Sequence, residues 1–338
     1  MKRNISVATL VSTYRTSTRK RIADGRYTAA IIFICSLIFW GAGALFALDT
    51  AAKYLPLWAV RFMTDSNVYI LRIVALLFSL PAAFLMNSYV ILERRVAWQP
   101  CMMMLAAAVA FNVQSDISAF LSMLLPVILM GLLFRLDDTG NIVLKFYTLF
   151  AVAATFVFFF PQLLIFLPLL LLYPALSGKL SARSFFAALL GVITPLWIAT
   201  ALVYLFPSLA LILESPMALS ATLWQTSHIV LSPAMLMMLI AEFVVAFPAM
   251  IHFFVTASIG RTHLRRRMIF CIVSDIVLWL AGWLCPELLL LFFVWRLPIY
   301  SLLSAYIFSV LPPKTSNIYI ILSLLLWLAS MVVEAWIG

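Results

Sequence analysis

The chain has 338 residues, of which 66% are hydrophobic and only 10% are charged, and its formal net charge is +10. Soluble domains hold about 45–50% apolar and about 25% charged residues. Because a soluble protein must present a largely polar surface to water, this composition excludes an ordinary soluble domain and predicts an integral membrane protein. The positive charges lie beside apolar segments, which indicates anionic lipid headgroups as partners and not nucleic acid.

About eleven apolar segments are long enough, or nearly long enough, to cross a bilayer as helices. In chain order they lie at residues 28–48, 69–92, 97–111, 117–134, 142–160, 162–173, 184–206, 233–259, 268–284, 288–310 and 319–336. We therefore predict an all-α fold, a single polytopic transmembrane bundle that comprises residues 1–338.

Basic residues mark every second connection between these segments. The connections expected outside the cell hold only Lys53 and Arg61. Those expected in the cytoplasm begin with the basic N-terminal segment 1–27 and hold Arg94, Arg95, Arg135, Lys179, Arg183, Arg261, Arg265, Arg266, Arg267 and Lys314. Positive loops stay in the cytoplasm during insertion. The bias predicts a multi-pass membrane protein with its N-terminus inside and its C-terminus outside.

The first outer connection, residues 49–68, mixes apolar and charged residues and is expected to form an amphipathic helix on the outer surface. It contains Asp49, Arg61 and Asp65, and Arg72 follows just inside the next span. Such a helix can anchor the chain among the headgroups, or it can form one wall of an outward-facing site. In the second case Asp49 or Asp65 would meet an acceptor, and Arg61 a phosphate.

The segment 97–176 is irregular. Its apolar pieces are short or are interrupted by Pro126, Pro161 and Pro168. Interrupted backbone at membrane depth must be shielded by protein or border a wet cavity, because lipid cannot satisfy its polar groups. The sequence leaves two alternatives: short helical hairpins with tight turns, or a region that lines a cavity.

Asp275 and Arg296 lie inside two consecutive spans that run in opposite directions. At ~1.5 Å per residue, Asp275 lies about 10 Å from the inner end of its helix, and Arg296 about 12 Å from the outer end of the next helix. An isolated charge in lipid is expensive, so we expect an ion pair between them. The pair would fix helix packing, or Arg296 would face a cavity and bind an anionic group such as phosphate.

Two further titratable residues, Glu242 and His252, share the span 233–259. Their spacing of ten residues places them on different faces of a helix, so no shared site is expected. A carboxyl group in lipid must be paired, protonated or in contact with water, which makes Glu242 a candidate for function. The few, scattered His and Cys predict no metal site and no cofactor is indicated, although a divalent metal ion is compatible with the sequence.

The order of these features resembles the multi-spanning glycosyltransferases of the GT-C architecture. The shared features are a basic N-terminal segment, one span, an outer loop that begins with Asp49, and crowded short hairpins from Trp98 to Pro174. The stretches 112–116, 156–161 and 179–183 also resemble an uncharacterised family of polytopic bacterial inner-membrane proteins. The GT-C resemblance implies that an acid in the first outer loop acts at the acceptor and that basic residues hold a polyprenyl-phosphate donor.

The leading hypothesis from the sequence is therefore a GT-C-like glycosyltransferase that uses a polyprenyl-phosphate-linked sugar at the outer face. Asp49 and Asp65 would be the catalytic residues of such an enzyme. The leaving phosphate would be stabilised by Arg61, Arg72 or Arg296.

Two other functions are compatible with the same residues. The first is a membrane transporter that uses the intramembrane groups Glu242, Asp275 and Arg296 along its path. The second is a non-catalytic subunit of an envelope assembly, which would bind a protein partner through the basic run 261–267.

Overall fold

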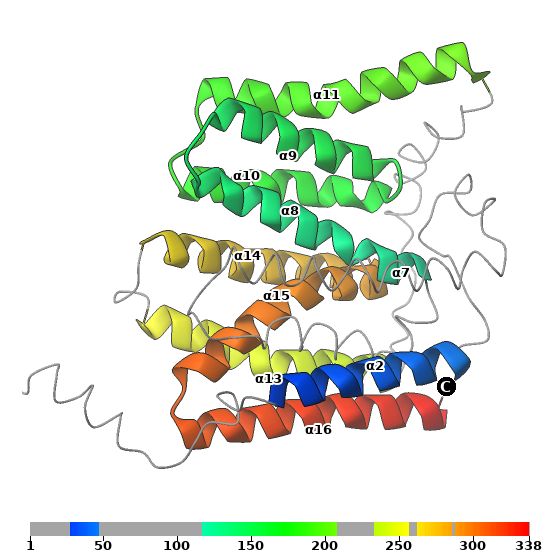
Figure 1. Cartoon of the computed structure of the whole chain (residues 1–338), viewed down its shortest axis with the longest axis vertical. Coiled ribbons are helices and arrows are strands. Elements are labelled where there is room, and N and C mark those ends of the chain that lie inside the picture. The colour runs from blue at the N-terminus through cyan, green and yellow to red at the C-terminus, as the bar shows by residue number, and fades with distance from the viewer. Residues whose placement is uncertain (1–27, 47–116, 208–232, 257–261, 286–287, 338) are drawn as a thin grey trace, which may run out of the picture.

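The computed structural model describes residues 28–46, 117–207, 233–256, 262–285 and 288–337. Within these ranges the chain forms helices and no strand (Figure 1), which confirms the predicted all-α class. In chain order the helices are α2 (Thr28–Phe46), α7 (Ile117–Ser122), α8 (Leu124–Phe134), η2 (Arg135–Asp137), α9 (Ile142–Val157), η3 (Pro161–Ile165), α10 (Phe166–Leu176), α11 (Ala182–Leu205), α13 (Pro233–Thr256), α14 (Thr262–Leu284), α15 (Leu289–Val310) and α16 (Pro313–Ile337).

Five of the described helices are long and apolar enough to cross a membrane, namely α11, α13, α14, α15 and α16. Helices suit lipid because their backbone N–H and C=O groups are satisfied within the same segment. The five predicted spans from 184–206 onwards are confirmed as helices, although α14 and α16 begin earlier than expected, at Thr262 and Pro313. The predicted spans 69–92 and 97–111 lie outside the described residues, so the total of about eleven stays a prediction.

Prolines divide the helices of the irregular segment. The predicted helix 117–134 is split into α7 and α8, because Pro126 has no N–H to donate to the carbonyl of Ser122 four residues earlier. Pro161 acts in the same way on α9, which ends at Val157. The turn η3 then leads into α10, so this helix begins at Phe166, later than the sequence predicts.

Tight turns join these short helices into hairpins. Gly140 lies between α8 and α9 with φ 128°, and Gly178 lies between α10 and α11 with φ 68°, values that glycine adopts without a steric cost. The Asn141 side chain accepts hydrogen bonds from the first N–H groups of α9, and Ser181 forms a capping box with Ser184 at the start of α11. The described part of this segment forms the hairpins, and together with α11 it also lines a cavity of about 420 Å³ through Ala151, Thr155, Phe158 and Phe159.

The helices form two groups, α7 to α11 and α13 to α16, that meet along α15 (Figure 1). In the first group α9 packs against α11, and in the second α13 packs against α16 and α15. Between the groups, α15 contacts α7 and α8, and α10 contacts α14. The apolar stretch of α15 is 94% buried and that of α11 only 17%, so α15 lies at the centre and α11 at the edge.

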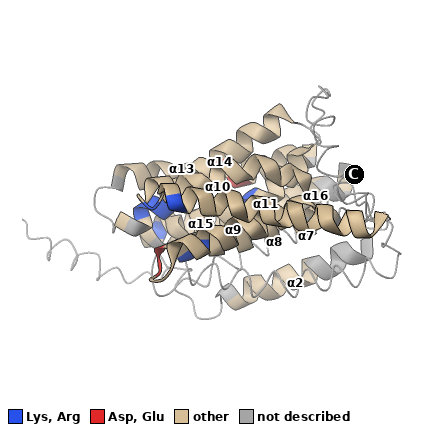
Figure 2. Ribbon diagram, turned by 90° about the horizontal axis from the view of Figure 1, so that it is seen from above, with Lys and Arg blue, Asp and Glu red and all other residues tan. Residues whose placement is uncertain are grey.

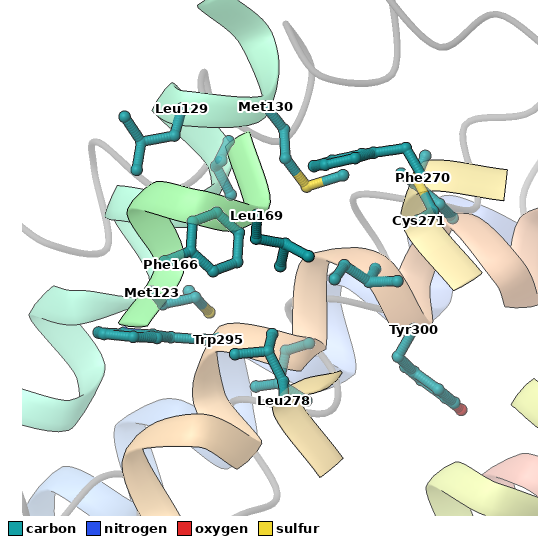
Figure 3. Close-up of a cluster of buried hydrophobic side chains, with 14 of the residues drawn as sticks. Met123, Leu129, Met130, Phe166, Leu169, Phe270, Cys271, Leu278, Trp295 and Tyr300 are labelled. Carbon is teal, nitrogen blue, oxygen red and sulfur yellow. The ribbon is translucent and has the colours of Figure 1, made fainter. Parts of the chain in front are cut away.

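Large side chains from both groups fill the space between α8, α10, α14 and α15 (Figure 3). Trp295 of α15 meets the ring of Phe166 of α10 edge-on, with 6.4 Å between the ring centroids. Phe270 of α14 meets Phe134 of α8 in the same way at 6.2 Å. Inside a membrane, the exclusion of water does not drive helices together. Close van der Waals packing of this kind stabilises their association instead.

Basic side chains gather at one end of the helices (Figure 2). Eight of the nine Lys and Arg in the described ranges lie in connections or in the first two turns of a helix at this end, which we call the basic end: Arg135, Lys145, Lys179, Arg183, Arg265, Arg266, Arg267 and Lys314. The ninth, Arg296, lies within α15. The alternation of helix direction matches the charge pattern of the sequence, and the cytoplasmic location of the basic end stays a prediction.

Candidate functional site

Three charged side chains from three helices meet in the interior of the second group. Arg296 of α15 contacts Asp275 of α14, with 2.8 Å between Nε and Oδ1, and Glu242 of α13, with 3.0 Å between Nη1 and Oε2. Arg296 and Asp275 are each 3% exposed, and Glu242 is completely buried. We call these three residues the Arg296 triad.

The burial of α15 explains why Arg296 needs partners. A charge on a helix that is covered by protein almost all round loses its water, and only opposite charges and hydrogen bonds can replace it. Asp275 supplies both: its two carboxylate oxygens accept from Nε at 2.8 Å and from Nη2 at 3.2 Å. This two-bond arrangement matches the planar fork of the guanidinium group. The ion pair that the sequence predicts between Asp275 and Arg296 is therefore confirmed.

Glu242 is bound less completely. Its 3.0 Å contact with Arg296 qualifies as an ion pair by distance, but the groups are not oriented for a hydrogen bond. A hydrogen bond weakens steeply when its angle is poor, so this contact is an ion pair without a hydrogen bond. Both carboxyl oxygens of Glu242 consequently have no hydrogen-bond partner among the described residues.

The charges of the Arg296 triad do not cancel when all three groups are ionised. Two carboxylates and one guanidinium carry a net charge of −1, and the site is shielded from water. A single proton on one carboxyl group removes this excess charge. Asp275 accepts two hydrogen bonds from Arg296, and protonation would weaken them. Glu242 accepts none from the described residues, so a proton on Glu242 disturbs the site less than a proton on Asp275.

The Arg296 triad is enclosed. The cavity beside Arg296 has a volume of about 10 Å³ and is walled by apolar side chains that include Leu239, Leu278 and Phe292. The Trp279 ring also lies 5.5 Å from the guanidinium carbon. A space of this size approaches the minimum for one water molecule and excludes a sugar or a phosphate.

From the sequence, Glu242 is expected to share a transport path with Asp275 and Arg296, but its contact with Arg296 is not predicted. Its depth was a usable signal: in an inward span that begins at residue 233, Glu242 lies about 13 Å from the outer end. The predicted depth of Arg296, about 12 Å from the same surface, is nearly identical. Matching depths between non-consecutive helices would have added Glu242 to the expected pair of Asp275 and Arg296.

His252 lies apart from the Arg296 triad, as its spacing from Glu242 predicts. Its Nδ1 is 3.2 Å from the hydroxyl oxygen of Tyr306 on α15, and the two rings meet edge-on. The imidazole thus connects α13 to α15 at a different level of the membrane.

A second polar cluster lies at the basic end and was not predicted. Asp137 of η2 accepts hydrogen bonds from Lys179 at 2.8 Å, from Arg267 at 2.8 and 3.0 Å, and from the Tyr173 hydroxyl. Arg267 belongs to α14, so this cluster joins the two helix groups. Burial alone would raise the pKa of Asp137, but the hydrogen bonds from Lys179, Tyr173 and Arg267 and the charge of Arg267 outweigh it and lower the pKa.

The residues proposed for the outer catalytic site, Asp49, Asp65, Arg61 and Arg72, lie outside the described residues, as does the loop 49–68. Within the described ranges, no three His, Cys, Asp or Glu side chains are grouped closely enough to hold a metal ion. Comparisons of the chain with protein-family models, with curated proteins and with solved structures found no match.

Proposed function

We propose that the protein is a proton-linked membrane transporter in which Glu242 takes up and releases a proton beside the Asp275–Arg296 pair. The observation that carries the proposal is the Arg296 triad: two carboxyl groups share one guanidinium group in a site closed to solvent. Buried ionisable groups of this kind in membrane helices are costly and are found along ion and proton pathways.

The protonation state of Glu242 sets the charge of the closed site. With a proton on Glu242 the triad is neutral, because Asp275 and Arg296 balance each other. After loss of the proton the site carries one uncompensated negative charge, which favours a conformation that admits water or a cation. This difference between two states couples the proton to a movement of α13 against α14 and α15.

The helices that carry the triad contain points where they can bend. Pro298 follows Arg296 by two residues in α15, and Pro248 follows Glu242 by six residues in α13. Each proline leaves the carbonyl four residues earlier without its helical hydrogen bond. Small changes in helix direction are therefore least costly near the triad.

Proton flux into liposomes tests this proposal. The purified protein is reconstituted with an internal pH-sensitive dye, and a pH gradient is imposed. We expect flux that depends on the protein and is lost in Glu242→Gln, which mimics the protonated carboxyl group. The control Asp138→Asn makes the same chemical change at an exposed position at the basic end and should keep the flux. Equal flux in protein-containing and empty liposomes, or unchanged flux in Glu242→Gln, would contradict the proposal.

The glycosyltransferase hypothesis rests on Asp49, Asp65, Arg61 and Arg72 and stays a prediction. Arg296 is a weak candidate for the phosphate ligand of such an enzyme, because Asp275 and Glu242 already engage it in a closed space. Transfer of label from a polyprenyl-phosphate sugar by the purified protein would support the enzyme, and full activity of Asp49→Asn would remove that residue from the scheme.

A further inference from the structure

Among the described residues, the basic end carries more positive than negative charge. Its eight basic residues face two acidic ones, Asp137 and Asp138, so the described residues leave an excess of six positive charges there. Asp137 already binds Lys179 and Arg267. Exposed basic side chains at a membrane surface attract anionic lipid headgroups.

Two exposed arginines border the same connection at the basic end. Arg183 lies in the first turn of α11, directly after the α10–α11 connection, and no described side chain pairs with it. Arg266 lies in the second turn of α14, and its Nη1 donates to the carbonyl of Ser177 in that connection at 3.4 Å. This long contact uses one of the five N–H donors of the guanidinium group and leaves the others available.

An apolar stripe continues from Arg183 along α11. Phe186 is 63% exposed, Leu190 58%, Ile193 54% and Trp197 72%, and their spacing of three or four residues places them on one face of the helix. A membrane lipid has the same order of groups along the membrane normal, with a charged headgroup at the surface and an acyl chain below it. Free phosphate would match the arginines but not the stripe.

We propose that Arg183 and Arg266 bind the phosphate headgroup of an anionic membrane lipid whose acyl chain lies along α11 over Phe186 and Leu190. Guanidinium groups match phosphate oxygens with paired hydrogen bonds, and each basic residue near a membrane surface favours anionic lipid. The lipid would join the edge helix α11 to α14 and so connect the two helix groups at the basic end. This site is independent of proton transfer at Glu242.

Site-specific photo-cross-linking tests the lipid site in the intact protein. A photo-cross-linking amino acid replaces Phe186, and the protein is placed in nanodiscs with equal amounts of phosphatidylglycerol and phosphatidylcholine. The matched position is Ile318 of α16, which is 64% exposed and lies one turn beyond the exposed Lys314 at the basic end. At position 186 we expect cross-links to phosphatidylglycerol to outnumber those to phosphatidylcholine, and each of the two arginines should contribute roughly a fivefold preference. At position 318 the excess should be smaller.

Variants assign the preference to the arginines. The double variant Arg183→Gln and Arg266→Gln should bring the lipid ratio at position 186 down to the bulk ratio, whereas Lys314→Gln should leave it unchanged. The unfolding temperature of each variant is measured to show that the fold is retained. The same lipid ratio at positions 186 and 318, or an unchanged ratio in the double variant, overturns the proposal. Inorganic phosphate is also added at constant ionic strength. If it abolishes the preference for phosphatidylglycerol, the site binds free phosphate and the lipid proposal is overturned.

Discussion

Arg296 contacts acidic side chains from two other helices, Glu242 of α13 and Asp275 of α14, and all three are buried. Removal of the guanidinium group leaves two carboxyl groups without a cation. We expect Arg296→Gln to lower the free energy of unfolding by about 3–5 kcal/mol, the usual cost of breaking a buried ion pair from one side.

Thermal unfolding in detergent measures this loss, and a compensated variant separates charge from packing. Arg296→Gln combined with Glu242→Gln and Asp275→Asn removes all three charges and should recover most of the stability. A single variant as stable as the original protein would show that the Arg296 triad contributes little to the fold.

Asp137 predicts a pH dependence of stability at the basic end. Its pKa is lower in the folded protein than its ordinary value of 3.8, so the group stabilises the fold above that value. The stabilisation is lost as the pH falls through the folded pKa. Asp137→Asn should therefore lower the free energy of unfolding by on the order of 1–3 kcal/mol near neutral pH. Below about pH 4 the variant and the original protein should be equally stable.

Unfolding temperatures of both proteins across this pH range check the prediction. Asp138→Asn, an exposed carboxyl group in the same turn, is the control and should follow the original protein at every pH. A constant difference between Asp137→Asn and the original protein at low and neutral pH would contradict the assigned pKa shift.

At the scale of the helices, Gly191 allows α11 to approach α9 closely. A Cβ atom at this position would lie 2.6 Å from the Tyr147 carbonyl oxygen and 3.1 Å from the Phe150 Cβ. Because the nearest of these atoms belongs to the backbone of α9, an added methyl group forces the two helices apart. Gly191→Ala should therefore lower the free energy of unfolding by about 1–3 kcal/mol.

Gly131 of α8 provides the matched control for Gly191. A Cβ atom there meets nothing within 4 Å, so Gly131→Ala should be neutral or stabilise by about 0.5–1 kcal/mol through helix propensity. Unfolding measurements on both variants test the contrast. Equal effects at the two positions would argue against the close α9–α11 contact.

The sequence predicts the long helices well, because an apolar stretch bounded by charge has few alternatives in lipid. It also contains the helix breaks: Pro126 and Pro161 each lack the N–H that would bond the last residue of the helix before them. The predicted segment 117–134 forms two helices and not one, because Pro126 breaks it after Ser122. The predicted helix 142–160 extends past the observed end at Val157, because Pro161 cannot donate a hydrogen bond to the Val157 carbonyl.

For the whole molecule, the two polar clusters differ in how far the sequence predicts them. Asp275 and Arg296 lie on consecutive helices and each charge would be costly alone in lipid, so the sequence predicts their contact. Asp137 and Arg267 are 130 residues apart, and their contact depends on how the two helix groups pack, which hydropathy and charge do not encode. The sidedness of the basic end and the residues before Ile117 that are expected to form an outer site stay predictions.

Infrared difference spectroscopy of the reconstituted protein measures directly whether Glu242 binds a proton in the closed site. We predict a band from a protonated carboxyl group in the original protein that disappears in Glu242→Gln and persists in Asp138→Asn. A spectrum without such a band, or a band unchanged by Glu242→Gln, would show that Glu242 does not carry the proton.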